Sequence, residues 1–106
     1  MKKAEQIEIN KKVLVAMHDG LVELENDERQ GLVRWIPLNY CQASYAFTRG
    51  HYAVLKSYNT IVAVTDVYTG YCYDFSRFVY GYTATTAQHI CKFAKHFDAD
   101  RLTYRN

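Results

Sequence analysis

YGYTATTAQHICKF, residues 80–93, is the stretch that decides the predicted fold, because an aromatic run passes into a helix there. Thr85, followed three residues later by Gln88, matches a capping box, in which each side chain hydrogen-bonds the backbone N–H of the other residue. We therefore predict a helix from Thr86 to about Phe97. Its apolar side chains recur at helical spacing and would form one buried stripe: Ala87, Ile90, Phe93, Ala94 and Phe97.

The residues upstream of this helix are rich in β-branched and aromatic side chains, which favour strands. The segment SYNTIVAVT, residues 57–65, predicts one strand, and residues 66–70 predict a turn. Two alternating aromatic runs follow at residues 71–75 and 78–82, and we expect them to pair as neighbouring strands. Residues 101–106 form a short tail that could add an edge strand.

The first half of the chain predicts a succession of hairpins. Residues 1–11 are polar and are expected to form a loose arm. The segments KVLVAM (residues 12–17) and LVELE (residues 21–25) predict two strands, because both are short and rich in apolar residues. The HDG tripeptide between them, residues 18–20, contains the Asp-Gly dipeptide that favours a hairpin turn.

The segment that follows is less regular. Residues 26–31 are charged and predict a solvated loop. Residues 32–36 predict a third strand that ends at Pro37, because proline cannot donate to a central ladder. Residues 40–47 fit either a short helix or another strand. We favour the helix, ended by residues 49–50.

These elements together predict an α+β fold in a single domain, residues 1–106. It consists of an antiparallel β-sheet arranged as a meander, with one main C-terminal helix packed on one face. The N-terminal half, residues 1–51, is expected to be β-rich, and residues 52–106 carry a strand, a hairpin and the helix. A chain of 106 residues is long enough for one core.

The composition excludes several classes of protein. A net charge of +2 gives little steering toward phosphate, and the three cysteines contain no C-x-x-C pair for zinc or redox chemistry. We see no signal peptide and no apolar run that could span a membrane, so we expect a cytoplasmic protein. Ten tyrosines stand out, and tyrosine suits wet contact surfaces.

No catalytic constellation is visible, and we predict a protein that is not an enzyme and needs no metal or cofactor. His89 has no partner at the spacing of a zinc site, and Cys91, two residues away on a helix, would point elsewhere. We expect the imidazole of His89 to hydrogen-bond a threonine or a strand carbonyl. Four residues are assigned to this structural motif: Thr85, Thr86, Gln88 and His89.

Two motifs in the second half resemble those of a known group of proteins. SYNTIVA (residues 57–63) and YTATTAQHICKF (residues 82–93) resemble the patterns S-Y-x-T-x-V-A and Y-[ST]-x-T-T-x-x-H-I-x-x-F. These patterns belong to a family of small uncharacterised proteins from bacteriophages and other mobile elements of Firmicutes. The resemblance implies a phage or mobile-element context. It implies no mechanism, and it does not extend to the first fifty residues, which look like an added or diverged half.

We therefore predict that the protein binds and inhibits a host protein, with a Cas effector as the most specific version of the target. The alternative is a nucleic-acid-binding accessory protein that uses an aromatic sheet face. A homodimer is left open. The predicted binding surface consists of aromatic residues and one arginine: Trp35, Tyr58, Tyr68, Tyr71, Tyr73 and Arg77.

Overall fold

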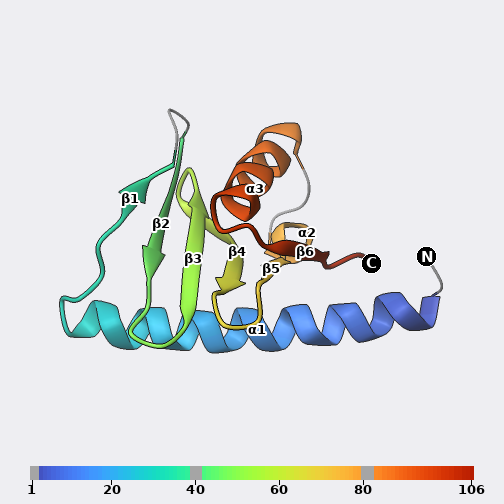
Figure 1. Cartoon of the computed structure of the whole chain (residues 1–106), viewed down its shortest axis with the longest axis horizontal. Helices are drawn as coiled ribbons and strands as arrows, with labels where there is room; N and C mark the ends of the chain where they lie inside the picture. Colours follow the sequence, from blue (N-terminus) through green and yellow to red (C-terminus); the bar gives the residue numbers. More distant parts are fainter. Residues whose placement is uncertain (1–2, 39–41, 80–82) are drawn as a thin grey trace.

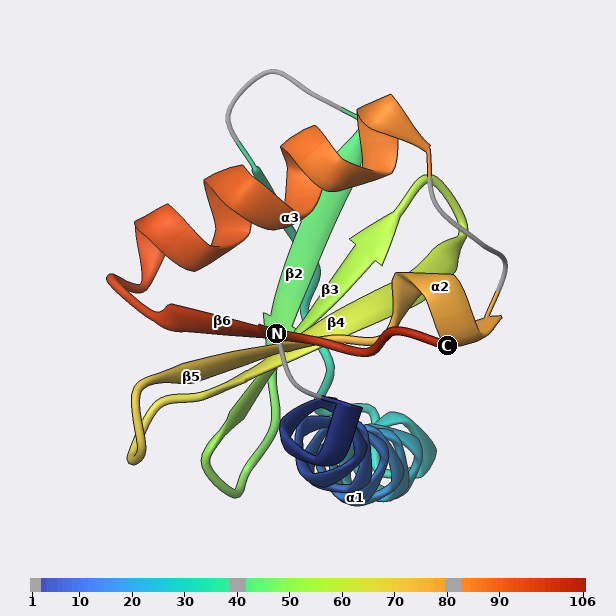
Figure 2. The same ribbon diagram turned by 90° about the vertical axis from the view of Figure 1, so that its right-hand side faces the viewer.

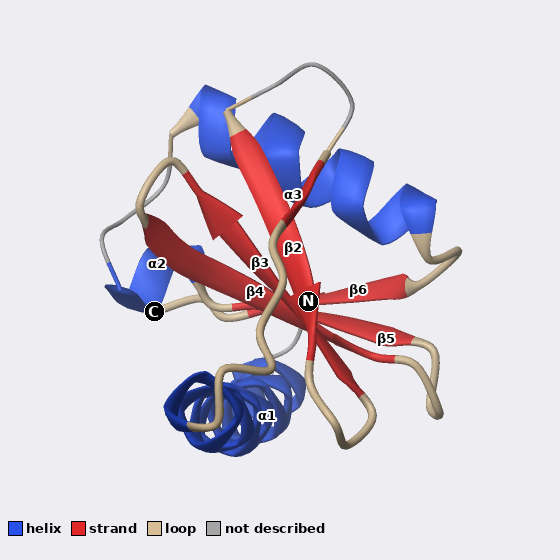
Figure 3. Cartoon of the chain, turned by 90° about the vertical axis from the view of Figure 1, so that its left-hand side faces the viewer, coloured by secondary structure: helices blue, strands red, loops and turns tan. Residues whose placement is uncertain are grey.

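The computed structural model of the chain describes residues 3–38, 42–79 and 83–106. Its elements follow in the order α1 (Lys3–Arg29), β1 (Ile36–Pro37), β2 (Ala43–Phe47), β3 (Tyr52–Ser57), β4 (Thr60–Asp66), β5 (Tyr71–Asp74), α2 (Ser76–Val79), α3 (Ala84–His96) and β6 (Asp100–Thr103). Helix α1 runs along one side of the sheet (Figure 1), and α3 covers the opposite face (Figures 2 and 3). The sheet is therefore the middle of three layers.

The sheet holds its strands in chain order, from β1 at one edge to β6 at the other. Neighbouring strands from β1 to β5 are antiparallel, whereas β6 runs parallel to β5. A parallel neighbour requires a crossover connection, which α2 and α3 provide. The predicted α+β class is confirmed. The sheet is mixed rather than wholly antiparallel, and the main helix is N-terminal rather than C-terminal.

Helix α1 replaces the hairpin predicted for the first half of the chain. The two predicted strands (residues 12–17 and 21–25) and the predicted turn (residues 18–20) lie within this one helix, so these predictions are wrong. The predicted arm is wrong over residues 3–11 and the predicted loop over residues 26–29, since the helix runs from Lys3 to Arg29. Residues 30–31 form a turn, as predicted, and residues 1–2 lie outside the described residues. Its buried residues recur at spacings of three and four: Val13, Ala16, Gly20, Leu24 and Asp27.

Gly20 shows why the turn prediction failed. An Asp-Gly dipeptide favours a turn when only local preferences act. In the folded chain, a Cβ at Gly20 would lie 2.9 Å from Cγ1 of Val64, so the missing side chain lets the helix approach the sheet closely. Tertiary packing therefore explains this glycine, and local backbone freedom does not.

The region between α1 and β3 also differs from the prediction. Ala43–Phe47 is a strand and not the favoured helix, while residues 40–41 of that prediction lie outside the described residues. Of the predicted third strand, only Ile36 belongs to β1, and Pro37 completes this two-residue edge strand. Proline is tolerated at an edge because its missing N–H costs no ladder hydrogen bond there.

The strand predicted over residues 57–65 is divided between two strands. Ser57 ends β3 and Thr60 begins β4, so Tyr58 and Asn59 form the hairpin turn. Tyr58 has a φ of 55°, in the left-handed region that reverses the chain direction. The predicted turn before β5 is confirmed, since residues 67–70 form it.

The described element before α3 is the short helix α2 rather than a strand, and α3 begins with a different cap from the predicted one. The helix begins at Ala84, and the hydroxyl of Thr83 accepts a hydrogen bond from the N–H of Thr86 at 3.1 Å. The capping box predicted at Thr85 is therefore wrong by two residues. The second aromatic run contains α2, so its prediction as a strand is wrong over residues 78–79, and residues 80–82 lie outside the described residues.

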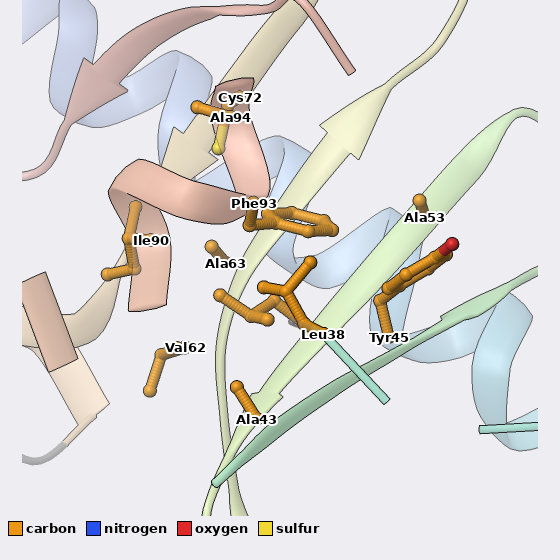
Figure 4. Close-up of a cluster of buried hydrophobic side chains, with 11 residues drawn as sticks. Leu38, Ala43, Tyr45, Ala53, Val62, Ala63, Cys72, Ile90, Phe93 and Ala94 are labelled. Carbon is orange, nitrogen blue, oxygen red and sulfur yellow. The ribbon is translucent and has the colours of Figure 1, made fainter. Parts of the chain in front are cut away.

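Two buried clusters hold the layers together, one on each face of the sheet. The cluster under α3 (Figure 4) contains Leu38, Ala43, Tyr45, Ala53, Leu55, Val62, Ala63, Cys72, Ile90, Phe93 and Ala94. The cluster under α1 contains Val13, Ala16, Leu24, Tyr52, Val54, Val64 and Phe75. The predicted packing of α3 through Ile90, Phe93 and Ala94 is confirmed, but the helix faces only one of the two clusters.

Candidate binding surface

Two hairpin turns meet beside the middle of α1, and a pair of hydrogen-bonded side chains joins them. Nδ1 of His51, at the β2–β3 turn, donates to Oδ1 of Asp66 at 2.8 Å. The same oxygen accepts from the backbone N–H groups of Tyr68 at 2.9 Å and Thr69 at 3.3 Å. Burial acts to raise the pKa of Asp66, but the hydrogen bonds outweigh it and hold the pKa below its usual value. The carboxylate therefore fixes both turns in one arrangement.

This arrangement presents an exposed aromatic ring. The ring of Tyr68 stacks on that of His51 with a centroid distance of 5.0 Å and an interplanar angle of 13°. Tyr68 nevertheless remains 81% exposed, and its neighbours Val67 and Tyr71 are 43% and 40% exposed. We call His51, Val67, Tyr68 and Tyr71 the turn patch. The turn patch is an apolar and aromatic surface, and the ring of Tyr68 at its centre is held in place by the ring of His51.

Helix α1 anchors the β2–β3 turn from the other side. The buried carboxylate of Asp27 accepts from the N–H of Arg49 at 2.7 Å. The carboxylate of Glu23 lies against Gly50, in the space that a Cβ at this position would occupy. Burial raises the pKa of Glu23, and its Oε2 is buried without a hydrogen-bond partner among the residues that the structure describes. Helix α1 therefore holds the β2–β3 turn, which carries His51 of the turn patch.

A shallow pocket of about 280 Å³ lies between α1 and these turns. It is lined by His18, Asp19, Val22, Glu23, His51 and Tyr52. Burial, with Asp19 and Asp66 nearby, raises the pKa of Tyr52 to about 12, so its hydroxyl stays protonated at neutral pH. Among the described residues, no group of three histidine, cysteine or carboxylate side chains is placed to hold a metal ion. Nδ1 of His51 and Oδ1 of Asp66 are already engaged in the hydrogen bonds that join the two turns.

A second pocket, of about 310 Å³, lies at the β1 edge of the sheet and is lined by Trp35, Pro37, Gln42, Ala43, Ser44 and Tyr58. Nζ of Lys56 lies 4.0 Å from the centre of the Trp35 ring, a cation–π contact. The N–H of Tyr58 donates to the carbonyl of Gln42 at 2.7 Å, and the Tyr58 side chain is 55% exposed. The pocket therefore has two aromatic rings in its lining, and a cation lies over one of these rings.

The two sequence motifs meet behind this pocket. The hydroxyl of Ser57 and Nδ1 of His89 are hydrogen-bonded at 2.7 Å, and His89 is only 4% exposed. The ring of Tyr58 lies 5.7 Å from that of His89. Burial, followed by the charge of Lys92, lowers the pKa of His89, so the imidazole is neutral at pH 7. Its partner is therefore a serine hydroxyl from β3, where the sequence predicted a threonine or a carbonyl.

The predicted binding residues do not form one surface. Trp35 and Tyr58 share the β1 pocket, and Tyr68 and Tyr71 belong to the turn patch. Tyr73 lies on the face of β5 that packs under α1, and Arg77 is half-buried in α2. Among the predicted motif residues, Thr85 and Gln88 are exposed, whereas Thr86 and His89 are buried.

Sequence reasoning missed His51, Asp66 and Glu23. Asp66 carries a local signal, because an aspartate opening a turn that ends in Gly70 is typical of a side chain that bonds the backbone ahead of it. The pairing of Asp66 with His51, 15 residues away, depends on the alignment of two hairpins. No local pattern contains that information.

Among the described residues, no helix has both the length and the apolar character needed to cross a membrane. No curated protein and no solved structure matches the chain. A family match runs over residues 4–106, through α1 as well as through the strands and α3. Because this match covers nearly the whole chain, the protein belongs to the family described as "Family of unknown function (DUF8033)".

Proposed function

We propose that the protein acts by binding another protein through the turn patch. The observation that supports this most is the ring of Tyr68, which is 81% exposed yet stacked on His51. A surface aromatic side chain that is already ordered loses little conformational freedom on binding, so more of its contact energy remains as affinity. Tyrosine is also enriched among residues that contribute most to interfaces.

The context we propose for this binding is inhibition of a host protein. The resemblance of residues 57–63 and 82–93 to small phage and mobile-element proteins supports it, and a Cas effector is the most specific target to test. In this role the protein is a non-enzymatic, cytoplasmic inhibitor. The hydrogen-bonded turns and the apolar patch supply a rigid contact surface, which an inhibitor of this type requires.

The first experiment measures binding and inhibition with Tyr68→Ala. Purified protein would be tested for capture of host proteins and for protection of a plasmid from CRISPR interference. We expect Tyr68→Ala to reduce both at least tenfold while the thermal midpoint stays unchanged, because the ring is exposed. The matched control is Tyr58→Ala, which removes a tyrosine that is 55% exposed and lines the pocket at the β1 edge. Unchanged capture by Tyr68→Ala would contradict the proposal.

The alternative is nucleic-acid binding at the β1 pocket. Trp35 and Tyr58 line this pocket and the ammonium group of Lys56 lies over the Trp35 ring, and proteins that bind single strands likewise combine aromatic rings that stack on bases with basic side chains. The measurement is the affinity for a labelled single-stranded RNA at several salt concentrations. This alternative predicts binding that weakens steeply with salt and is lost with Trp35→Ala. Binding that Trp35→Ala leaves intact would exclude this pocket as the nucleic-acid site.

A further inference from the structure

The outward face of α1 carries a heptad pattern that the proposed function does not use. Its members follow one another at spacings of three and four, and all are exposed: Glu8, Lys11, Val15, His18, Val22, Glu25 and Arg29. We call this set the outer stripe. At 3.6 residues per turn it lies opposite the buried residues Val13, Ala16 and Leu24. Figures 2 and 3 show the sheet and α3 on one side of α1, with no described element on the other.

The chemistry of the outer stripe is symmetric about His18. Moving away from His18 in the two directions, the stripe pairs like with like or acid with base: Val15 with Val22, Lys11 with Glu25, and Glu8 with Arg29. A second α1 running antiparallel and centred on His18 would place each of these residues against its counterpart. A parallel pair would instead place every residue of the stripe against itself, so that Lys11 faces Lys11 and Glu25 faces Glu25.

The apolar residues of the stripe and its flank fit the same antiparallel register. Val15 and Val22 are 61% and 44% exposed, and they lie on the stripe on either side of His18. Leu14 and Leu21 lie beside them, half-buried and one heptad apart. In the antiparallel register Leu14 of one copy lies across from Leu21 of the other. Pairing of the two helices would thereby cover both valines and the exposed parts of both leucines.

The charge of α1 is also divided along its length. Residues 3–12 carry three basic and two acidic side chains, whereas residues 13–29 carry one basic and five acidic side chains. Opposite ends of two such helices attract, and equal ends repel. The charge distribution and the stripe therefore select the same orientation.

We propose that α1 pairs with α1 of a second copy of this chain through the outer stripe, antiparallel and centred on His18. Such a dimer is two-fold symmetric, and both copies use the same surface. Glu8 already forms an ion pair with Lys11, and Glu25 with Arg29, on the surface of a single helix. In the dimer these four side chains join into networks at each end. Exposed ion pairs are individually weak, so the dimer dissociates on dilution and at high salt.

The test is a charge exchange measured by sedimentation equilibrium of the full chain. The native protein is expected to approach twice its chain mass of 12.4 kDa with rising concentration. Lys11→Glu and Glu25→Lys should each weaken self-association at least tenfold, because each homodimer then places like charges together at both ends. An equimolar mixture of the two variants should dimerise again, because every contact then joins an acid to a base. The matched control is Lys92→Glu, an exposed charge reversal on α3.

Several outcomes would overturn the proposal. A native chain that remains a monomer at several hundred micromolar would do so, as would a dimer that Lys11→Glu leaves intact. Failure of the mixture to recover would exclude the antiparallel register. Far-ultraviolet circular dichroism of each variant establishes that the helix content is unchanged. If Lys11→Glu is poorly folded, Val15→Lys tests the same surface and must also weaken the dimer.

Discussion

The two main helices have the same task, covering one face of a sheet, yet they differ in how their sequences show it. Helix α3 has its apolar residues on one side, with Ile90, Phe93 and Ala94 buried and exposed polar residues elsewhere. Helix α1 has apolar residues on two sides, since Val13 and Ala16 are buried while Val15 is exposed. Helical periodicity is therefore visible in a sequence when one face of the helix is apolar, and it is obscured when two faces are.

The largest expected effect comes from the buried face of each helix. Phe93 on the inner face of α3 is fully buried, and Leu24 on the inner face of α1 is 2% exposed. Phe93→Ala should lower the free energy of unfolding by about 3–5 kcal/mol and Leu24→Ala by about 2–5 kcal/mol, from lost burial and the cavity left behind. Urea unfolding followed by circular dichroism measures both. A loss below about 0.5 kcal/mol for Leu24→Ala, the range of surface changes, would mean that α1 is not docked as described.

A smaller effect distinguishes the observed helix cap from the predicted one. Thr83 accepts from the N–H of Thr86, whereas the side chain of Thr85 is exposed. Thr83→Ala should therefore lower stability by about 1 kcal/mol, the usual cost of losing a cap, and Thr85→Ala should cost much less. Thermal unfolding of the two variants compares them directly. The reverse order would restore the capping box at Thr85.

The smallest expected effect is a dependence of stability on pH, caused by His89 in α3. The pKa of His89 is lowered by burial, so the unfolded chain binds its proton more readily than the folded one. Stability should therefore fall as the pH drops below the usual histidine value of about 6.5, toward the lower folded pKa. His89→Gln should flatten the profile between pH 7 and 5.5. An equally steep profile in this variant would assign the effect to another group.

What the sequence could predict follows the same division between the two helices. The α+β class, a helix over residues 86–97 that overlaps the observed α3, and the burial of Ile90, Phe93 and Ala94 were predicted because apolar periodicity is a local signal. The N-terminal helix was not, because Val13 to Ala16 is apolar without interruption. Two of these four residues are buried against the sheet and two face elsewhere, and a short apolar run of this kind is indistinguishable from a buried strand.

The candidate binding surface divides in a similar way. Tyr68 and Tyr71 were predicted from composition alone, because exposed turns rich in tyrosine suit contact surfaces. The residues that hold the patch come from three distant segments: Glu23 on α1, His51 between β2 and β3, and Asp66 at the end of β4. Their proximity results from helix docking and strand register. Neither can be obtained from the spacing of residues along the chain.

The claim on which both surfaces depend is that residues 3–29 form one continuous helix, with an inner face on the sheet and an outer face free to pair. The most direct measurement is the distance between spin labels at positions 12 and 25, with labelled protein diluted into unlabelled chain to remove contributions between copies. A continuous helix predicts a backbone separation of about 20 Å, from a rise of 1.5 Å per residue. A separation of about 5 Å, typical of paired strands, would restore the hairpin and contradict the account.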